Sequence, residues 1–222
     1  MPRKKKEKKK VKEEEKLESQ DGLEDDDMST ADASANDIAV DNADEYSYNI
    51  KIPKDRIAVL IGVKGRDKKE LEDWSRAKIN VDSIEGDVTI TGKDALKLYE
   101  LKEVVQAIAR GFSPETAGLL LKPDYMLEII NLKDYGLDNP NKLRRVRARV
   151  IGTGGKARRV IEEMTSTQLS VYGKTIGIIG ECNYVTTAKR AIELLIKGSM
   201  HATVYKWLED QRRKARREEL GL

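Results

Sequence analysis

Residues 150–161 have the sequence Val-Ile-Gly-Thr-Gly-Gly-Lys-Ala-Arg-Arg-Val-Ile, in which three glycines fall within four positions. Glycine has no side-chain bulk and adopts positive φ angles readily, so this stretch predicts a tight turn that another molecule can approach closely. Residues 142–159 contain eight Lys or Arg and no Asp or Glu, which favours a phosphate chain as that molecule. If the residues after the turn start a helix, its free N–H groups and its dipole attract the same phosphates. The stretch therefore predicts a clamp for a nucleic-acid backbone.

The charges of the chain are segregated along its length. Of its 222 residues 36% are charged and only 5% aromatic, so a core must consist mainly of Ile, Leu, Val and Ala. Residues 1–16 carry nine basic and four acidic side chains, whereas residues 17–45 carry eleven acidic and no basic ones. Subtracting both segments from the totals of 42 basic and 39 acidic residues leaves 33 basic and 24 acidic in residues 46–222. The net charge of +3 thus conceals a basic folded part, which favours an anionic partner.

Residues 1–45 are poor in apolar side chains and contain no aromatic ones. Such a segment cannot bury enough surface to offset the entropy lost on ordering, so we expect a disordered charged tail. Three roles stay open for it: a solubilising segment, a competitor of RNA for the basic surface through residues 24–27, or an added phosphate contact through its lysines.

The cysteine content and the hydropathy of the chain indicate the cellular compartment in which we expect the protein. The single cysteine, Cys182, excludes an internal disulfide and fits a reducing compartment. No apolar run approaches membrane-spanning length, and the lysine-rich N-terminus is not followed by the apolar core of a secretion signal. We therefore expect a cytoplasmic protein without a membrane partner.

The predicted elements occur twice in the same order. In residues 46–111 the spacing of apolar residues predicts strands at 46–52, 78–83 and 88–91 and helices at 56–61, 66–76 and 94–110. Leu71 and Trp74 of the second helix are expected to face inward, and the third helix has its apolar residues at helical spacing, at Leu98, Leu101, Val105 and Ile108. In residues 124–198 the spacing of apolar residues predicts strands at 125–132, 168–172 and 175–179 and helices at 141–151, 156–165 and 184–197. Both segments therefore have the order β-α-α-β-β-α, and residues 112–123 are expected to connect them through a short helical stretch.

The two segments form an internal repeat with an offset of 90 residues at the glycine turn. The matched pairs are Ile61-Gly62 with Ile151-Gly152, Gly65 with Gly155, Leu71 with Ile161, Ile79 with Leu169 and Val81 with Val171. Repetition at this level of detail indicates two similar modules rather than one chance turn.

The combination of an Ile-Gly-x-x-Gly turn, an apolar helix position six residues later and a β-hairpin, present twice, resembles the KH family of RNA-binding modules. The resemblance implies an α+β fold with two tandem eukaryotic-type (type I) KH domains, at residues 46–111 and 124–198. In this family the turn clamps the backbone of four nucleotides, and the bases lie in an apolar groove beside it. Around the domains we expect the disordered tail 1–45, the linker 112–123 and an extra basic helix at 199–222.

The resemblance predicts RNA contacts at both turns and at basic residues around the second one. The predicted RNA-binding residues are Gly152, Thr153, Gly154, Gly155, Lys156, Arg158, Arg159, Arg145 and Arg149, together with Gly62, Val63, Lys64 and Gly65. Candidate groove residues, for which core packing is the alternative, are Val160, Ile161, Leu169 and Val171. The chain departs from the family three positions after each turn, because Lys68 and Arg158 replace the usual apolar residue.

Further stretches of the sequence indicate which group of KH proteins the chain resembles. The chain resembles archaeal relatives of the KRR-type small-subunit assembly factors, the Dim-two or partner-of-Nob-one family. This resemblance is carried by the tandem modules together with residues 152–161, residues 170–175 (Ser-Val-Tyr-Gly-Lys-Thr) and residues 201–205 (His-Ala-Thr-Val-Tyr). The resemblance implies binding of single-stranded ribosomal RNA near the 3′ end of the small-subunit RNA. It also implies the PIN-domain nuclease that trims this end and translation initiation factor two alpha as partners. For the first module it leaves both RNA and protein open as ligands.

Residues 200–222 have no counterpart in the first half. Their narrow apolar stripe consists of Val204, Trp207, Leu208, Gln211 and Ala215, and basic residues gather near the end. This predicted helix either only packs on the second module, with its cations complementing the helix dipole, or adds a contact for RNA or a partner.

Catalysis is not expected. Residues 152–156 lack the Gly-x-x-x-x-Gly-Lys-Ser/Thr spacing of a nucleotide-binding P-loop, and Ala157 stands where the magnesium-binding hydroxyl would be. His201 and Cys182 are the only histidine and cysteine, so we expect neither a metal site nor a cofactor.

The sequence therefore predicts a non-catalytic RNA-binding adaptor. The alternatives are a protein-interaction scaffold built on KH folds and a general RNA-binding factor in RNA decay or translation.

Overall fold

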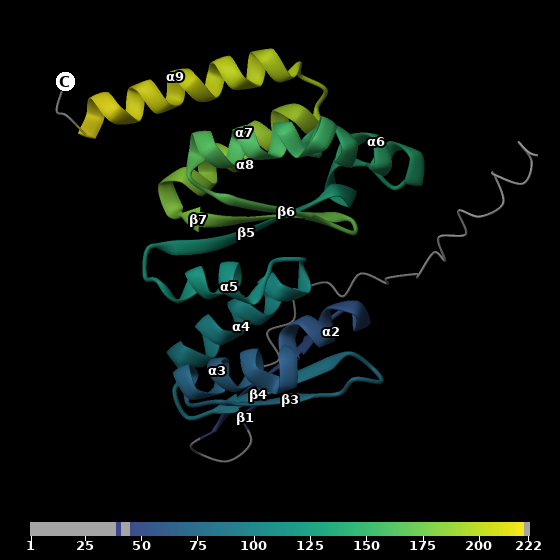
Figure 1. The fold of residues 1–222 in the computed structure, drawn as a ribbon, viewed down its shortest axis with the longest axis vertical. Helices are drawn as coiled ribbons and strands as arrows, with labels where there is room; N and C mark the ends of the chain where they lie inside the picture. The colour runs from purple at the N-terminus through teal and green to yellow at the C-terminus, as the bar shows by residue number, and fades with distance from the viewer. Residues whose placement is uncertain (1–38, 41–44, 220–222) are drawn as a thin grey trace, which may run out of the picture. The chain divides into compact units, whose positions relative to one another are not determined.

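The computed structural model describes residues 39–40 and 45–219, which include two α+β modules (Figure 1). The first module contains β2 Tyr46–Lys51, α2 Lys54–Ile61, α3 Arg66–Ser75, β3 Lys78–Val81, β4 Asp87–Gly92 and α4 Ala95–Ala109. The second module contains β5 Tyr125–Asn131, α6 Pro140–Ile151, α7 Lys156–Thr165, β6 Gln168–Tyr172, β7 Thr175–Glu181 and α8 Cys182–Ile196. Outside these modules lie β1 Ala39–Val40, α5 Pro114–Ala117 and α9 His201–Glu219. The predicted β-α-α-β-β-α order is confirmed in both modules.

Each module has an antiparallel sheet in which its last strand lies between the other two. The strand order is β1-β2-β4-β3 in the first module and β5-β7-β6 in the second. Ile50 pairs with Val88 across the first sheet, and Ile130 pairs with Ile176 across the second. Apart from β1, the two sheets therefore share one topology.

The helices of each module cover one face of its own sheet, and apolar side chains fill the space between them (Figure 1). The predicted apolar positions of α4 are all buried, namely Leu98, Leu101, Val105 and Ile108. The Asp94 carboxylate accepts hydrogen bonds from the backbone N–H groups of Leu96 and Lys97, which fixes the start of this helix. In the second module the repeat positions Ile161 and Leu169 are buried as well.

The connector between the modules packs into their cores. Phe112, Ala117 and Leu120 are buried in one cluster with residues of the first module and with Ile179 of β7. A Cβ on Gly177 of β7 would lie 2.6 Å from the Phe112 ring, so the absence of a side chain there lets the ring approach the strand. The connector is therefore part of the folded structure.

Polar contacts between the modules gather at the end of β6. The Tyr172 hydroxyl lies 2.8 and 2.7 Å from the two carboxylate oxygens of Asp55 in α2. Ser170 Oγ donates to the Arg110 carbonyl at 3.0 Å. Burial and, next, the hydrogen bond to Asp55 raise the pKa of Tyr172 to about 12. Strand β6 is thus held against the first module.

Two expectations from the sequence are corrected. Trp74, expected to face inward, is only half-buried, and the Lys97 ammonium lies 5.9 Å from the centre of its ring. Ala39–Val40, inside the predicted disordered tail, pair antiparallel with β2. An edge strand offers its backbone groups to another strand whatever the side chains, so composition did not reveal this pairing. The rest of the predicted tail, apart from Glu45, lies outside the described residues.

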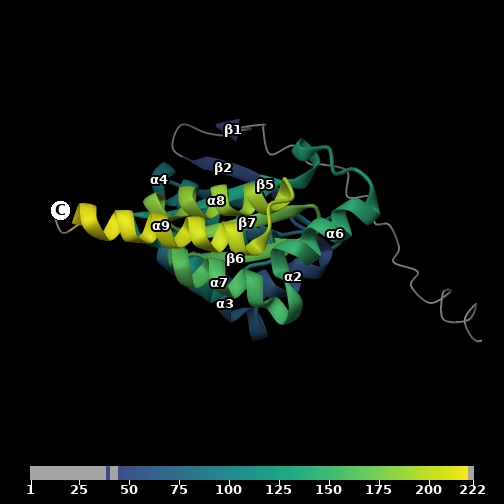
Figure 2. The same cartoon turned by 90° about the horizontal axis from the view of Figure 1, so that it is seen from above.

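The helix α9 packs on α7 and α8, on the side of these helices away from the sheet (Figures 1 and 2). Val204 and Leu208 are buried, whereas the remaining members of the predicted stripe are half-buried. At its start, His201 Nε2 lies 2.9 Å from the Arg149 carbonyl oxygen. The helix therefore packs on the second module, and the alternative of an added contact for RNA or a partner stays a prediction.

Candidate nucleic-acid interface

The glycine turn of the second module has a backbone that glycine adopts far more easily than other residues. Gly152 has φ 72° and ψ 172°, Gly154 has φ 59° and ψ 24°, and Gly155 has φ 75° and ψ 13°. Positive φ angles of this kind are strained for residues with a Cβ atom. The Gly155 N–H donates to the Gly152 carbonyl at 3.2 Å, which closes the turn.

The turn is closed on its inner side and open on its outer side. A Cβ on Gly152 would lie 2.7 Å from the Ala157 Cβ, so the turn packs tightly on α7 at this point. A Cβ on Gly154 would meet no described atom within 4 Å. Thr153 and Gly154 are both exposed. A ligand can therefore lie directly against the backbone of these two residues.

The helix α7 starts where the turn ends. Its N-cap is Gly155, and no described side chain accepts a hydrogen bond from the N–H groups there. The Lys156 N–H, the first of this ten-residue helix, donates to the Thr153 carbonyl, and the following N–H groups and the helix dipole attract an anion that lies on the turn. Lys156 is exposed and places a cation at the same point.

The predicted arginines around the turn differ in what they contact. Arg145 is exposed on α6. Arg159 Nη2 donates to the Gly154 carbonyl at 2.5 Å, which holds the guanidinium beside the turn. Arg149 Nη2 donates instead to the carbonyls of Gly198 and the next residue, at 2.7 and 2.6 Å. Arg149 thus anchors the segment that leads into α9, and its predicted RNA contact stays a prediction.

Glu162 is a site residue that sequence reasoning missed. Its Oε1 accepts hydrogen bonds from Arg158 Nε at 3.0 Å and from the Leu169 backbone N–H at 2.8 Å. The Glu162 side chain is 14% exposed, against 44% for Arg158. One carboxylate therefore joins α7 to β6 and turns Arg158 toward the seam between them. The i,i+4 spacing of Arg158 and Glu162 was the available signal.

The candidate groove residues are of two kinds. Ile161 and Leu169 are fully buried in the core, as the packing alternative expects. Val160 and Val171 are half-buried. Of the predicted set, only these two valines can offer apolar surface to a base.

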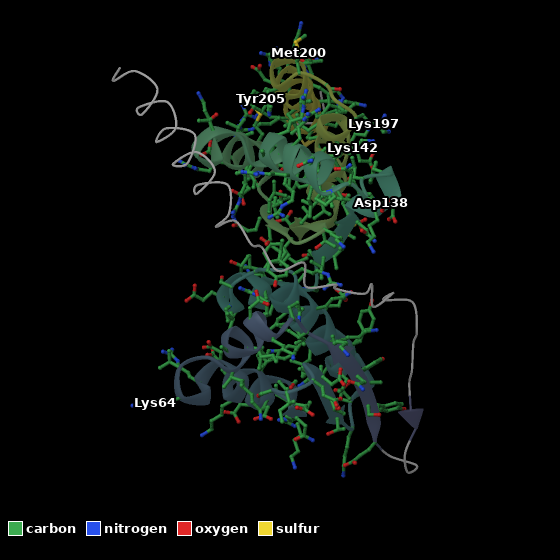
Figure 3. All side chains as sticks on the ribbon, turned by 90° about the vertical axis from the view of Figure 1, so that its right-hand side faces the viewer. Lys64, Asp138, Lys142, Lys197, Met200 and Tyr205 are labelled. Atoms are coloured by element: carbon green, nitrogen blue, oxygen red, sulfur yellow. The ribbon has the colours of Figure 1, made fainter. Side chains whose placement is uncertain are left out.

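The turn of the first module repeats the same backbone. Gly62 has φ 71° and ψ −178°, Lys64 has φ 56° and ψ 28°, and Gly65 has φ 76° and ψ 17°. Lys64 thus has the conformation that Gly154 has in the second module, and Figure 3 shows Lys64 at the outer edge of its module. Val63 beside it is 81% exposed.

A carboxylate distinguishes the first turn from the second. A Cβ on Gly62 would lie 2.2 Å from Asp67 Oδ2, so the Asp67 side chain covers the inner side of the first turn. Asp67 lies in the first turn of α3, and the repeat places Ala157 at the equivalent position of α7. The negative charge at the start of α3 complements the helix dipole and repels a phosphate. The second turn is therefore the more favourable phosphate site.

In residues 39–40 and 45–219, no three His, Cys, Asp or Glu side chains are grouped as metal ligands would be. Cys182 is an exposed free thiol. Within the same part of the chain, none of the helices combines the length and the apolarity that crossing a membrane requires.

Two segments of the chain match known family models. Residues 47–107 match the KH domain, and residues 126–213 match the eukaryotic type KH-domain (KH-domain type I). The second match extends into α9, which therefore belongs to the matched region of the second module. The expected pair of KH domains is confirmed.

Two relatives are similar in sequence to most of the chain. A KH domain-containing protein of Methanocaldococcus jannaschii is 45% identical over 177 residues, which cover 78% of this chain and 77% of the relative. The RNA-binding protein pno1 of Dictyostelium discoideum is 26% identical over 170 residues, which cover 74% of this chain and 71% of the relative.

Solved structures resemble the fold over most of their length. Dim2p of Pyrococcus horikoshii OT3 has a TM-score of 0.69 and 49% identity, covering 74% of this chain and 98% of that one. The complex of a/eIF2alpha, aDim2p and rRNA from the same organism gives a TM-score of 0.72 and 47% identity, covering 77% of this chain and 96% of that one. The chain therefore belongs to the family of KH-domain proteins that includes archaeal Dim2 and PNO1.

Proposed function

We propose that this chain is a ribosome-assembly factor that holds single-stranded small-subunit rRNA, near its 3′ end, at the turn of its second module. The observation that carries the proposal is the open outer side of the turn at Thr153 and Gly154, next to a helix start without a side-chain cap. The complex of the Pyrococcus relative with rRNA and a/eIF2alpha supports the same function. So do relatives named RNA-binding protein pno1 and pre-rRNA-processing protein pno1.

Affinity and selectivity have separate sources in this proposal. Phosphates lie against the backbone of Thr153 and Gly154, where the helix start and the cations beside the turn attract them. The bases carry the sequence information, and Val160 and Val171 offer them partly exposed apolar surface. If the strand neutralises about four charges, the logarithm of affinity falls with the logarithm of salt concentration with a slope of about −3.

The proposed partners follow from the same relatives. Because a/eIF2alpha is part of the Pyrococcus complex, translation initiation factor two alpha is a partner of this chain in the proposal. The PIN-domain nuclease is a second proposed partner, because a protein bound near the rRNA 3′ end lies where that nuclease trims. The turn of the first module, which carries Asp67, is the weaker phosphate site of the two, and both RNA and protein stay open as ligands of that module. The chain then acts in the cytoplasm as a non-catalytic adaptor.

Replacing Thr153 and Gly154 by Asp tests the proposal. Two negative charges on the open side of the turn should lower RNA affinity at least about thirty-fold, because hydrogen bonds to charged groups contribute about 1.5–3 kcal/mol each. Gly154→Lys is the matched control, because Lys64 has the same backbone conformation in the first module. We expect this control to keep RNA binding, and the two variants, which share the strain of a Cβ atom at the positive φ of residue 154, to melt at similar temperatures. Fluorescence anisotropy with a 3′-end rRNA oligonucleotide and thermal melting by circular dichroism measure both quantities.

The outcomes separate the proposal from its alternatives. Unchanged RNA affinity of the Asp variant would favour a protein-interaction scaffold. Sequencing of RNA crosslinked to the protein in cells should show enrichment of the small-subunit rRNA 3′ end. Crosslinks spread over messenger RNA would favour a general factor in decay or translation.

A further inference from the structure

A dense group of cations lies near the end of α9. Residues 212–217 contain five cations in six positions, and all five side chains are exposed. They are Arg212, Arg213, Lys214, Arg216 and Arg217. Arg213 Nη2 lies 2.7 Å from Glu209 Oε1, but an exposed pair of this kind adds little stability. The buried residues Val204 and Leu208 already account for the packing of this helix, so the cations are not needed to hold it.

Three of these cations line a groove within the second module. The groove has a volume of about 890 Å³ and lies between the end of α7, the start of α8 and α9. Its hydrogen-bonding lining includes Ser166, Thr187 and Gln211. Its cationic lining consists of Arg212, Lys214 and Arg216, against a single lining carboxylate, Glu181. The surface therefore combines a hollow shape, positive charge and hydrogen-bonding groups.

We infer that this groove and the five cations, together the α9 cationic groove, bind the phosphate backbone of a second segment of the RNA strand held at the turn. Four of the five cations are Arg, whose planar guanidinium matches phosphate oxygens with two parallel hydrogen bonds. Hydroxyl and amide groups of the lining add contacts to phosphate and sugar. A strand already held at the turn reaches this surface at high local concentration, which favours RNA over a separate acidic protein. The inference rests on the proposed function of the turn.

The distance between the two sites sets the length of RNA that contacts both. The helix α9 starts beside the end of α6, where His201 contacts the Arg149 carbonyl. Arg212 lies eleven residues further along α9. At a rise of about 1.5 Å per residue, the cations begin about 17 Å along the helix from that contact. Because a KH turn clamps about four nucleotides, only a longer strand reaches the α9 cationic groove.

A series of RNA lengths tests this inference on the full chain. The variant Arg212→Glu/Arg216→Glu is compared with the wild type on single-stranded oligonucleotides of about 6 and about 16 nucleotides, where the turn alone holds about four. We expect unchanged affinity for the short RNA. For the long RNA we expect a loss of about ten-fold or more, and a salt slope smaller in magnitude by about 1.4, because two phosphate contacts of about 0.7 each are removed.

A matched control separates the groove from the charge of α9 as a whole. Lys206 is exposed on the same helix but does not line the groove, whereas Arg216 does. Arg216→Glu and Lys206→Glu therefore change the net charge equally at different places. We expect Arg216→Glu to weaken binding of the long RNA several-fold more than Lys206→Glu does.

Cys182 provides a second measurement that needs no substitution. This exposed thiol, the only cysteine of the chain, lies between Glu181 and Asn183, and both of these residues line the groove. Long RNA should slow the reaction of Cys182 with a thiol reagent in proportion to the fraction of protein bound. The short RNA, bound at the turn, should leave the rate unchanged.

Several results of these experiments would contradict the inference. Equal losses on short and long RNA, equal effects of Arg216→Glu and Lys206→Glu, or an unchanged Cys182 rate at saturating long RNA would each overturn the inference. Protection of Cys182 by an acidic polypeptide but not by long RNA would overturn it in favour of a protein ligand. Failure of the wild type to bind either RNA would instead overturn the proposed function of the turn, and the inference with it.

Discussion

The two glycine turns have the same backbone and different surroundings. The first, third and fourth positions have φ angles of 71°, 56° and 76° in the first module and 72°, 59° and 75° in the second. The third position is Lys64 in one turn and Gly154 in the other, and the residue packed beneath the turn is Asp67 in one and Ala157 in the other. The fold thus preserves the shape of the turn, while the charge beside it differs. A turn of this shape is not by itself evidence of RNA binding.

The repeat also preserves a part-buried hydrogen bond between helix and strand. Glu72 accepts a hydrogen bond from the Ile79 N–H of β3 at 2.8 Å, as Glu162 does from the Leu169 N–H of β6 at the same distance. The cation paired with this carboxylate differs between the modules. Lys68 Nζ lies 3.8 Å from Glu72 Oε1 in the first module, and Arg158 Nε lies 3.0 Å from Glu162 Oε1 in the second. Residues that join helix to strand are therefore alike in the two modules, and the residues that face solvent have diverged.

The largest expected difference between the two turns is in the free energy of unfolding when the first glycine of each turn is replaced. Gly152→Ala places a Cβ at φ 72° and ψ 172°, a region that residues other than glycine rarely adopt, 2.7 Å from the Ala157 Cβ. Strain and overlap should together lower the free energy of unfolding by about 2–5 kcal/mol. Gly62→Ala should lower it less, because the new Cβ meets the movable Asp67 side chain. Urea denaturation of both variants measures the difference.

A double variant separates strain from overlap in the first turn. Gly62→Ala/Asp67→Ala keeps the positive φ angle but removes the carboxylate that the new Cβ meets. Its unfolding free energy should therefore exceed that of Gly62→Ala. Equal destabilisation by Gly152→Ala and Gly62→Ala would contradict the importance of the contact with Ala157.

A smaller effect, on the base preference of RNA binding, is expected when the cation three positions after each turn is replaced. Glu162 neutralises Arg158 and turns it toward β6, so we expect Arg158→Gln to change the base preference of RNA binding at one nucleotide position about five-fold or more. The salt slope should stay unchanged. Lys68→Gln in the first module is the matched control and should alter neither quantity. A salt slope smaller in magnitude by about 0.7, with no change in base preference, would show that Arg158 contacts phosphate instead.

The smallest expected effect concerns the contact that joins the modules. The pKa of Tyr172 is about 12 in the folded protein against an ordinary value of 10.0, so folding favours the neutral hydroxyl. This contribution to stability is complete below pH 10 and is lost as the pH rises through about 12. Tyr172→Phe should lower the free energy of unfolding by about 0.5–1.5 kcal/mol at neutral pH. It should also reduce the fall in stability between pH 10 and 12, and denaturation at pH 8 and pH 11 checks both statements. An undiminished fall in the variant would contradict this role of Tyr172.

Local patterns were sufficient to predict the elements and the turns. The spacing of apolar residues located the six elements of each module, and the glycines at 62, 65, 152 and 155 located both turns. The ends of several elements differ from the predicted ones by one or two residues, because caps such as Asp94 determine where a helix begins. The hydrogen bonds of Glu162 were not predicted, because a carboxylate on a basic helix has the same local pattern whether it faces solvent or a strand.

Contacts between distant residues could not be predicted from local patterns. The Tyr172 hydroxyl contacts Asp55, 117 residues away, and the Arg149 guanidinium contacts the Gly198 carbonyl, 49 residues away. The sequence by itself determined that there are two repeated modules and that a basic glycine turn belongs to the second. Only the tertiary structure decided which cations remain available to RNA and which are held by the protein's own carbonyls and carboxylates. The physical reason is that these partners come within hydrogen-bonding distance only when separate helices and strands have packed together.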